Sequence, residues 1–136
     1  MKILVVDGQG GGMGKALVQA LKREVPGHTV LALGTNAMAT AAMLKAGADA
    51  GATGENAIAY NCGDADLILG PYGIVLANAM LGEISPRIAR AVSESPAERI
   101  LLPVSRCHTT LVGLEHRSVA QLVEEAARLA AERCNR

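Results

Sequence analysis

A glycine-rich segment near the start of the chain limits the possible folds most strongly. Five of the seven residues in Gly8–Gly14 are glycine, and Lys15 follows them. The segment comes directly after Lys2–Asp7, an apolar run typical of a strand that is buried on both faces of a parallel sheet. Apolar residues at helical spacing follow it. A strand, a glycine turn and a helix in this order predict an α/β fold.

The rest of the chain alternates in the same way between short apolar runs and amphipathic segments. Its 136 residues are enough for one domain with its own core. We expect helices that end near Val25, Ala46, Asn61 and Glu94, and a last helix that starts with a capping box at Ser118 and Gln121. The further strands are expected at His28–Leu33, Ala48–Ala52, Asp66–Gly70 and Arg99–Val104, and Cys107–Leu114 is either a loop or an additional edge strand. The order predicts a three-layer Rossmann-like sandwich, with a mostly parallel sheet of five or six strands and helices on both faces.

One apolar segment, Ile74–Leu81, stands out between Gly73 and Gly82 and is interrupted only by Asn78. It is too short to span a bilayer. We expect a buried helix or a contact between subunits, so the chain is predicted to form a homo-oligomer, with this segment as the candidate contact.

Composition limits the partners and the compartment. Thirteen basic residues balance thirteen acidic ones, and the chain has no Phe or Trp, so we expect neither a nucleic-acid nor a membrane partner. The apolar run at the N-terminus is too short for a signal peptide. The three cysteines, Cys62, Cys107 and Cys134, have no metal-ligand spacing. We therefore expect a cytoplasmic protein with reduced thiols and no metal.

The spacing of the glycines points to a phosphorylated ligand. Gly8, Gly12 and Gly14 form G-x-x-x-G-x-G, which resembles the cofactor loop of short-chain dehydrogenases. Glycine lets the backbone approach a pyrophosphate, which then faces the positive end of the following helix. The predicted phosphate-binding residues are Gly8, Gln9, Gly10, Gly11, Gly12, Met13, Gly14 and Lys15.

Two other interpretations of the loop are weaker. A Walker A loop needs glycine five residues before Gly14 and Ser or Thr after Lys15, but Gln9 and Ala16 occupy those places. The glycines would also allow tight packing of a strand on a helix, although five are more than packing requires. The dinucleotide interpretation itself lacks one feature, because the second strand ends in Leu33–Asn36 without the acid that binds ribose hydroxyls. A mononucleotide or another phosphorylated ligand therefore stays open.

Further polar clusters follow other predicted strands, where ligands bind in open parallel sheets. From these clusters we expect Thr35, Asn36, Thr53, Gly70, Pro71 and Gly73 to join the glycine loop in cofactor binding. If the first and fourth strands are neighbours, Gly70–Gly73 faces the loop across a crevice.

Catalytic candidates are few. Dehydrogenases with this loop use Tyr-x-x-x-Lys, but Asp64 and Leu76 stand at the lysine position after Tyr60 and Tyr72. The weak candidates are Glu55 as a general acid or base, which competes with a helix-capping role, and Cys107 with His108, which are adjacent in sequence. We interpret Glu83 as a charge beside the first turn of the helix that begins at Ser85-Pro86.

Long stretches of the chain resemble a family of small bacterial proteins catalogued only as a domain of unknown function. The resemblance is carried by Met1–Lys15, Leu33–Asn56, Gly70–Ile74 and Leu81–Pro86. It implies a compact Rossmann-like domain, and it brings no substrate and no catalytic residue.

The favoured hypothesis is a Rossmann-like protein that binds a nucleotide, preferably a dinucleotide such as NAD(P), through Gly8–Lys15. Two alternatives stay open. One is a small enzyme that handles phosphoryl or acyl groups in the same crevice, and the other is a non-catalytic sensory or assembly subunit.

Overall fold

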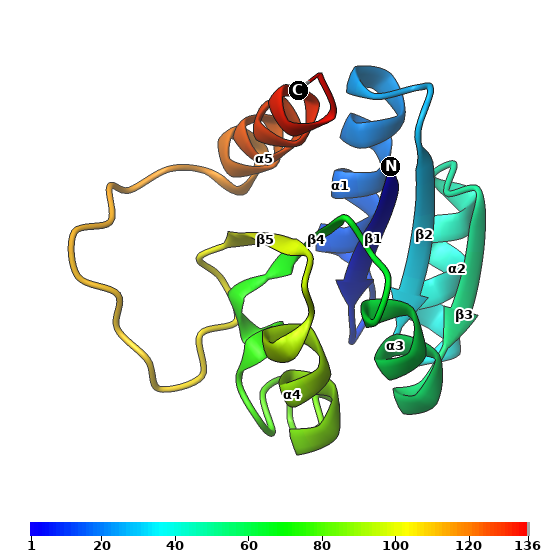
Figure 1. Ribbon diagram of the computed structural model, residues 1–136. Helices are drawn as coiled ribbons and strands as arrows, with labels where there is room; N and C mark the ends of the chain where they lie inside the picture. Colours follow the sequence, from blue (N-terminus) through cyan, green and yellow to red (C-terminus); the bar gives the residue numbers. More distant parts are fainter. Residues whose placement is uncertain (136) are drawn as a thin grey trace.

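The computed structural model describes residues 1–135. Strands and helices alternate along the chain (Figure 1). In chain order the elements are β1 (Lys2–Asp7), α1 (Gly12–Glu24), β2 (Thr29–Gly34), α2 (Ala37–Lys45), β3 (Ala50–Thr53), α3 (Glu55–Cys62), β4 (Leu67–Pro71), the 3-10 helix η1 (Tyr72–Val75), α4 (Pro86–Glu94), β5 (Glu98–Leu102) and α5 (Val119–Cys134). The strands begin and end within two residues of the predicted bounds. The capping box of Ser118 and Gln121 starts α5 as predicted.

The five strands form one parallel sheet in the order β3-β2-β1-β4-β5. The central strand β1 pairs with β2 on one side and with β4 on the other, and Val5 lies opposite Ala32 and Leu69. The winding direction changes between β1 and β4, which makes the edge beyond them the switch point where open α/β sheets bind ligands. This Rossmann-like architecture confirms the predicted fold class.

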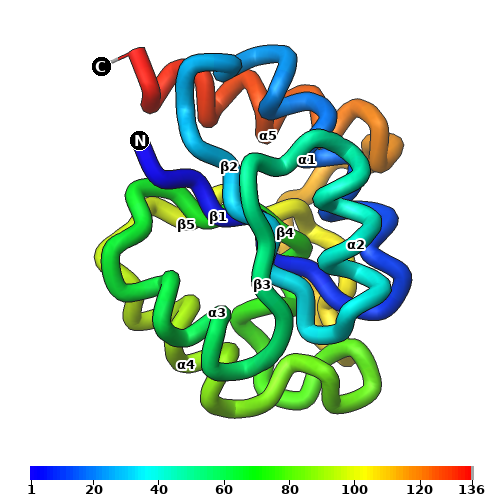
Figure 2. The backbone as a smooth tube through the Cα atoms, turned by 90° about the vertical axis from the view of Figure 1, so that its right-hand side faces the viewer, coloured from blue at the N-terminus to red at the C-terminus, as the bar shows by residue number. Residues whose placement is uncertain are grey.

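The two faces of the sheet bury separate apolar clusters. Ile3 and Val5 of β1 pack toward α1, α2 and α5, whereas Leu4 and Val6 pack toward α3 and α4. Figure 2 shows α1 and α2 on one side of the sheet and α3 and α4 on the other. Because successive residues of a strand face opposite ways, one apolar run supplies both clusters. The three layers are those expected from the sequence.

The prediction of a helix over Ile74–Leu81 is wrong. The 3-10 helix η1 ends at Val75, and turns follow it. Asn78, Met80 and Leu81 have φ angles of 68°, 58° and 58°, a left-handed backbone that cannot continue an α-helix. Met80 is buried in the core, but Leu81 is 98% exposed. Ile74 and Val75 thus end η1, and residues 76–81 belong to an irregular connection, residues 76–85, between η1 and α4.

A sixth strand at Cys107–Leu114 is also absent from the described residues. Cys107, His108 and Gly113 have φ angles of 44°, 57° and 87°, which interrupt an extended chain. The whole connection from β5 to α5 is irregular and forms a wide arc beside the sheet (Figure 1). Within residues 1–135, no helix has the length and apolar character needed to cross a membrane.

Candidate functional site

The glycine loop turns sharply between β1 and α1. Gly11 caps the helix with a φ of 74°, and its N–H donates to the carbonyl of Gly8 at 2.9 Å. A Cβ atom at Gly11 would lie 2.8 Å from the Cα atom of Ala39 in α2. Both the backbone angle and the close approach of α2 require glycine here. Gly12, by contrast, has open space around the position of a Cβ atom.

A buried carboxylate lies beneath the loop. Asp7, 4% exposed, accepts the N–H of Gly8 at 2.8 Å and the N–H of Gly14 at 2.7 Å through separate oxygens. Burial is the largest influence and raises the pKa of Asp7; the N–H donors of Gly14 and Gly8 oppose it, and the charge of Glu83 adds to it. Asp7 thus already satisfies one of the amides that the N-terminus of α1 leaves without a helical partner.

Three other amides of the loop lack a hydrogen-bond partner among the described residues. Within residues 1–135, no acceptor pairs with the N–H groups of Gly10, Gly12 and Met13. Gly10 and Gly12 are exposed and Met13 is partly exposed, and the exposed Lys15 follows one turn into the helix. Three amide donors, a helix N-terminus and a lysine together suit an anion that approaches from the outer side of the loop.

Glu83 closes the other side of the loop. Its Oε1 atom accepts from the N–H of Gln9 at 2.8 Å, the hydroxyl of Thr35 at 2.6 Å and the side-chain amide of Asn36 at 2.9 Å. The Thr35 hydroxyl, followed by the Gln9 amide, holds the pKa of Glu83 below its ordinary value. The interpretation of Glu83 as a helix-end charge is therefore wrong, because its carboxylate binds the glycine loop and the end of β2.

Sequence reasoning missed Glu83 because its partners are distant along the chain: Gln9 lies 74 residues away. One signal pointed toward such a residue, namely the missing acid at the end of β2. The structure supplies an acid at that place from the connection between η1 and α4.

Gly8 lies under this connection. A Cβ atom at Gly8 would be 2.7 Å from Oγ1 of Thr35, 2.9 Å from Sδ of Met80 and 3.0 Å from Oε1 of Glu83. The inner side of the loop is thus filled by protein atoms. Its outer side, with Gly10 and Gly12, is exposed, and Glu83 is partly exposed.

The other predicted binding residues lie at the same edge of the sheet in different surroundings. Thr35 and Asn36 join the loop through Glu83, and Asn36 also caps α2. Gly70 and Pro71 end β4, and Gly73 lies in η1 just beyond it. Because β4 pairs with β1, the condition for the predicted crevice is met, but all three residues are buried. Thr53 is further away, at the end of the edge strand β3, where its hydroxyl donates to Thr40 at 2.8 Å.

The catalytic candidates are not gathered at the loop. Glu55 accepts from the hydroxyl of Ser85 and from Arg87, which hold its pKa below the ordinary value and join α3 to α4. Cys107 and His108 are exposed in the β5–α5 connection, and no hydrogen bond joins their side chains. Among the residues described, no group of three or more His, Cys, Asp or Glu side chains is arranged to hold a metal ion.

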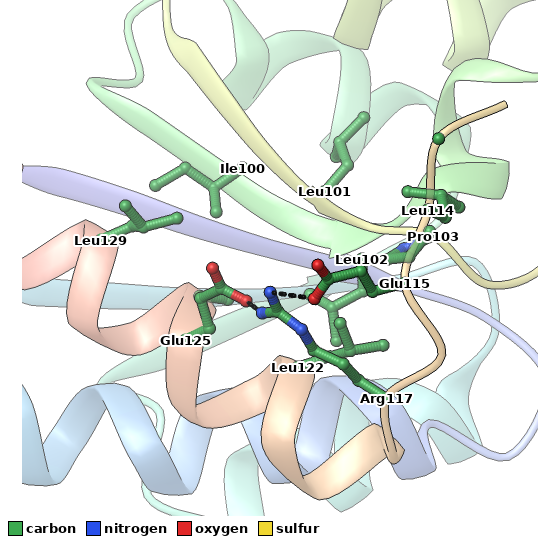
Figure 3. Close-up of a pocket in the computed structure, with 12 residues that line it drawn as sticks. Ile100, Leu101, Leu102, Pro103, Leu114, Glu115, Arg117, Leu122, Glu125 and Leu129 are labelled. Atoms are coloured by element: carbon green, nitrogen blue, oxygen red, sulfur yellow. Dashed lines mark hydrogen bonds and ion pairs between the residues drawn. The ribbon is translucent and has the colours of Figure 1, made fainter. Parts of the chain in front are cut away.

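A sizeable cavity, of about 460 Å³, lies elsewhere, between β5, α5 and the connection that joins them (Figure 3). We call it the β5–α5 groove. Its lining is mainly aliphatic, and Arg117 reaches across it between Glu115 and Glu125 (Figure 3). Since two carboxylates surround this guanidinium, the groove offers little attraction for a phosphate.

Comparison with known proteins adds the family. The chain matches the family described as Domain of unknown function (DUF3842) over residues 2–135. The chain belongs to this family. No curated protein matches it. A similar solved structure is the crystal structure of a dodecameric FMN-dependent Ubix-like decarboxylase from Escherichia coli O157:H7, at a TM-score of 0.48 and 20% identity, with 99% of this chain and 76% of that chain covered. Similarity at this level says nothing about a ligand of this chain.

Proposed function

We propose that this protein binds a nucleotide, with a phosphate on the outer side of the glycine loop. One observation carries the proposal: the amides of Gly10, Gly12 and Met13 have no acceptor within the described residues. The amides of Gly8 and Gly14 donate to Asp7, that of Gln9 to Glu83, and that of Gly11 to the carbonyl of Gly8. A loop that satisfies most of its amides and presents three at an exposed helix N-terminus favours an anionic ligand. The preferred ligand is a dinucleotide such as NAD(P).

The two carboxylates beside the loop oppose an anion, so their placement matters. Asp7 is buried beneath the loop, and both of its oxygens accept backbone amides. One oxygen of Glu83 accepts hydrogen bonds from three donors. Lys15 adds a positive charge on the outer side. Hydrogen bonds to a charged group contribute about 1.5–3 kcal/mol each, so three amides together favour a bound phosphate and oppose this repulsion.

Calorimetric titration tests the proposal. NAD+, NADH, NADP+, NADPH, FAD, FMN and the adenine mononucleotides are added in turn, and melting temperatures are recorded in parallel. We expect saturable heat and a raised melting temperature with at least one of them. The proposal is wrong if every ligand gives neither heat nor a thermal shift.

We also propose an assembly role as a second candidate, because Leu81 is 98% exposed in the connection that covers Gly8. A second copy would bury Leu81, so we propose that the chain forms a homo-oligomer with Leu81, within the predicted contact segment Ile74–Leu81, at the contact. Light scattering with Leu81→Ser should then show a lower mass than the unaltered protein. Equal masses would exclude this contact.

We further propose the cytoplasm as the location of the protein, because free Cys62, Cys107 and Cys134 fit a reducing compartment.

A further inference from the structure

The position of Glu83 has a bearing on which nucleotide the loop accepts. Its carboxylate touches the glycine loop through Gln9 and the end of β2 through Thr35 and Asn36. In dinucleotide-binding folds, the sugar hydroxyls are bound by an acid at the end of the second strand, close to the glycine loop. Here Thr35 and Asn36 occupy that end of the strand, and the acid comes from another part of the chain.

The two oxygens of Glu83 differ in their partners. Oε1 accepts from all three donors, which fixes the carboxylate in place. For Oε2, no donor lies within hydrogen-bonding distance among the described residues. The side chain is only partly buried. An anchored carboxylate with one remaining oxygen is suited to accept a hydroxyl from a ligand, because no reorganisation is required.

We infer that Glu83 determines sugar specificity at this site: Oε2 accepts a ribose hydroxyl and repels a 2′-phosphate, so that NAD is preferred over NADP. The inference rests on the proposed nucleotide function. Its physical basis is the contrast between the two ligands, since a hydroxyl donates to a carboxylate whereas a phosphate brings a like charge.

The charge around Glu83 supports this preference. An arginine near the same position would accommodate a 2′-phosphate, but the donors that face the carboxylate are a backbone amide, a hydroxyl and a neutral side-chain amide. Asp7 is a second acid beside the loop, and burial, with a smaller contribution from the charge of Glu83, raises its pKa. A second phosphate at this place would therefore meet negative charge, and none of the three donors to Glu83 carries a positive charge that would compensate it.

The test compares NAD+, NADP+ and inorganic pyrophosphate by calorimetry on the unaltered protein and on Glu83→Gln. We expect the unaltered protein to bind NAD+ at least about tenfold more tightly than NADP+, as one lost charged hydrogen bond implies. Glu83→Gln should weaken NAD+ about tenfold and bind pyrophosphate more tightly, because a nearby negative charge is removed. Weaker binding of NAD+ together with tighter binding of pyrophosphate separates recognition of the sugar from a general effect of charge. Glu94→Gln, on the exposed side of α4, is the control and should change none of the three.

Three results decide the matter. If Glu83→Gln binds all three ligands more tightly, Glu83 acts only through its charge, and the inference is overturned while nucleotide binding stands. If the unaltered protein binds neither NAD+ nor NADP+, the inference is overturned, and the proposed function fails as well only if the other nucleotides of the wider titration also give neither heat nor a thermal shift. Should Glu83→Gln not fold, Glu83→Asp replaces it: this side chain keeps the charge but is too short to reach its partners, so NAD+ should weaken without a gain for pyrophosphate. Unchanged affinities for both ligands in that variant would also overturn the inference.

Discussion

The glycine loop and the β5–α5 groove differ in the space that they enclose and in the polar groups that they present. The groove encloses about 460 Å³ and is lined mainly by aliphatic side chains, and its one arginine lies between two carboxylates (Figure 3). On the inner side of the loop, Met80 and Glu83 fill the space next to Gly8. Yet the loop holds three amides that have no acceptor within residues 1–135, together with a buried acid and an anchored carboxylate.

The comparison shows that volume and chemical specificity are located in different parts of this molecule. A ligand gains orientation from a few fixed polar groups, and an apolar hollow without such groups provides area only. The β5–α5 groove also lies where the sheet ends and the chain becomes irregular. We therefore expect changes in the loop to alter ligand binding and folding, and changes in the groove to alter neither strongly.

The largest effect is expected at Gly11. Gly11→Ala forces a side chain into the left-handed backbone and against the backbone of Ala39, at a cost of about 3 kcal/mol in the free energy of unfolding. The matched control is Gly12→Ala, which has open space and should retain stability within about 0.5 kcal/mol. Urea denaturation measures both. Equal stabilities of the two variants would show that the loop is not constrained in this way.

Asp7→Ala should lower stability next most, by about 2 kcal/mol, because it leaves the amides of Gly8 and Gly14 without an acceptor. Burial raises the pKa of Asp7 above its ordinary 3.8, so the neutral form favours the folded state. The unaltered protein should therefore exceed Asp7→Ala in free energy of unfolding most strongly below pH 3.8. This difference should decline as the pH rises through the folded-state pKa of Asp7.

The pH series is measured by urea denaturation from acid to neutral pH. Asp64→Ala is the control, since the side chain of Asp64 is 76% exposed. A difference between the unaltered protein and Asp7→Ala that grows with rising pH contradicts the account.

Lys15→Ala tests the charge on the outer side of the loop. We expect nucleotide affinity to fall about tenfold, the effect of one lost charged contact with a phosphate. Lys45→Ala, at the far end of α2, removes the same charge away from the loop and should leave the dissociation constant unchanged. If the two variants bind alike in calorimetry, Lys15 does not contact the ligand.

The smallest effect is expected in the β5–α5 groove. Arg117→Gln breaks exposed ion pairs to Glu115 and Glu125, which contribute at most about 1 kcal/mol to stability. Nucleotide affinity should not change. A tenfold loss of nucleotide affinity in this variant would indicate that the nucleotide binds in the groove and not at the loop.

The sequence predicted the layers and the strands well, because alternating apolar runs and helix caps such as Ser118 are local signals. It failed over Ile74–Leu81, where composition suggested a helix but three residues adopt a left-handed backbone. Composition cannot show this, because the conformation is imposed by packing: Met80 is buried against Gly8 while the adjacent Leu81 faces solvent.

The sequence likewise predicted one part of the candidate site and missed another. The loop and the N-cap Asn36 were found from short motifs. The role of Glu83 was not, because its three partners are brought to it only by the folded chain. The roles of Asp7 and Glu83 depend on which amides each carboxylate reaches, and spacing along the chain does not contain this information.

Amide chemical shifts during a titration with NAD+ test the central claim most directly. The account predicts that the largest shifts occur at the amides of Gly10, Gly12 and Met13, whereas those of Leu101 and Leu122 in the groove stay unchanged. Saturable shifts confined to the groove, with the loop amides unmoved, would contradict it.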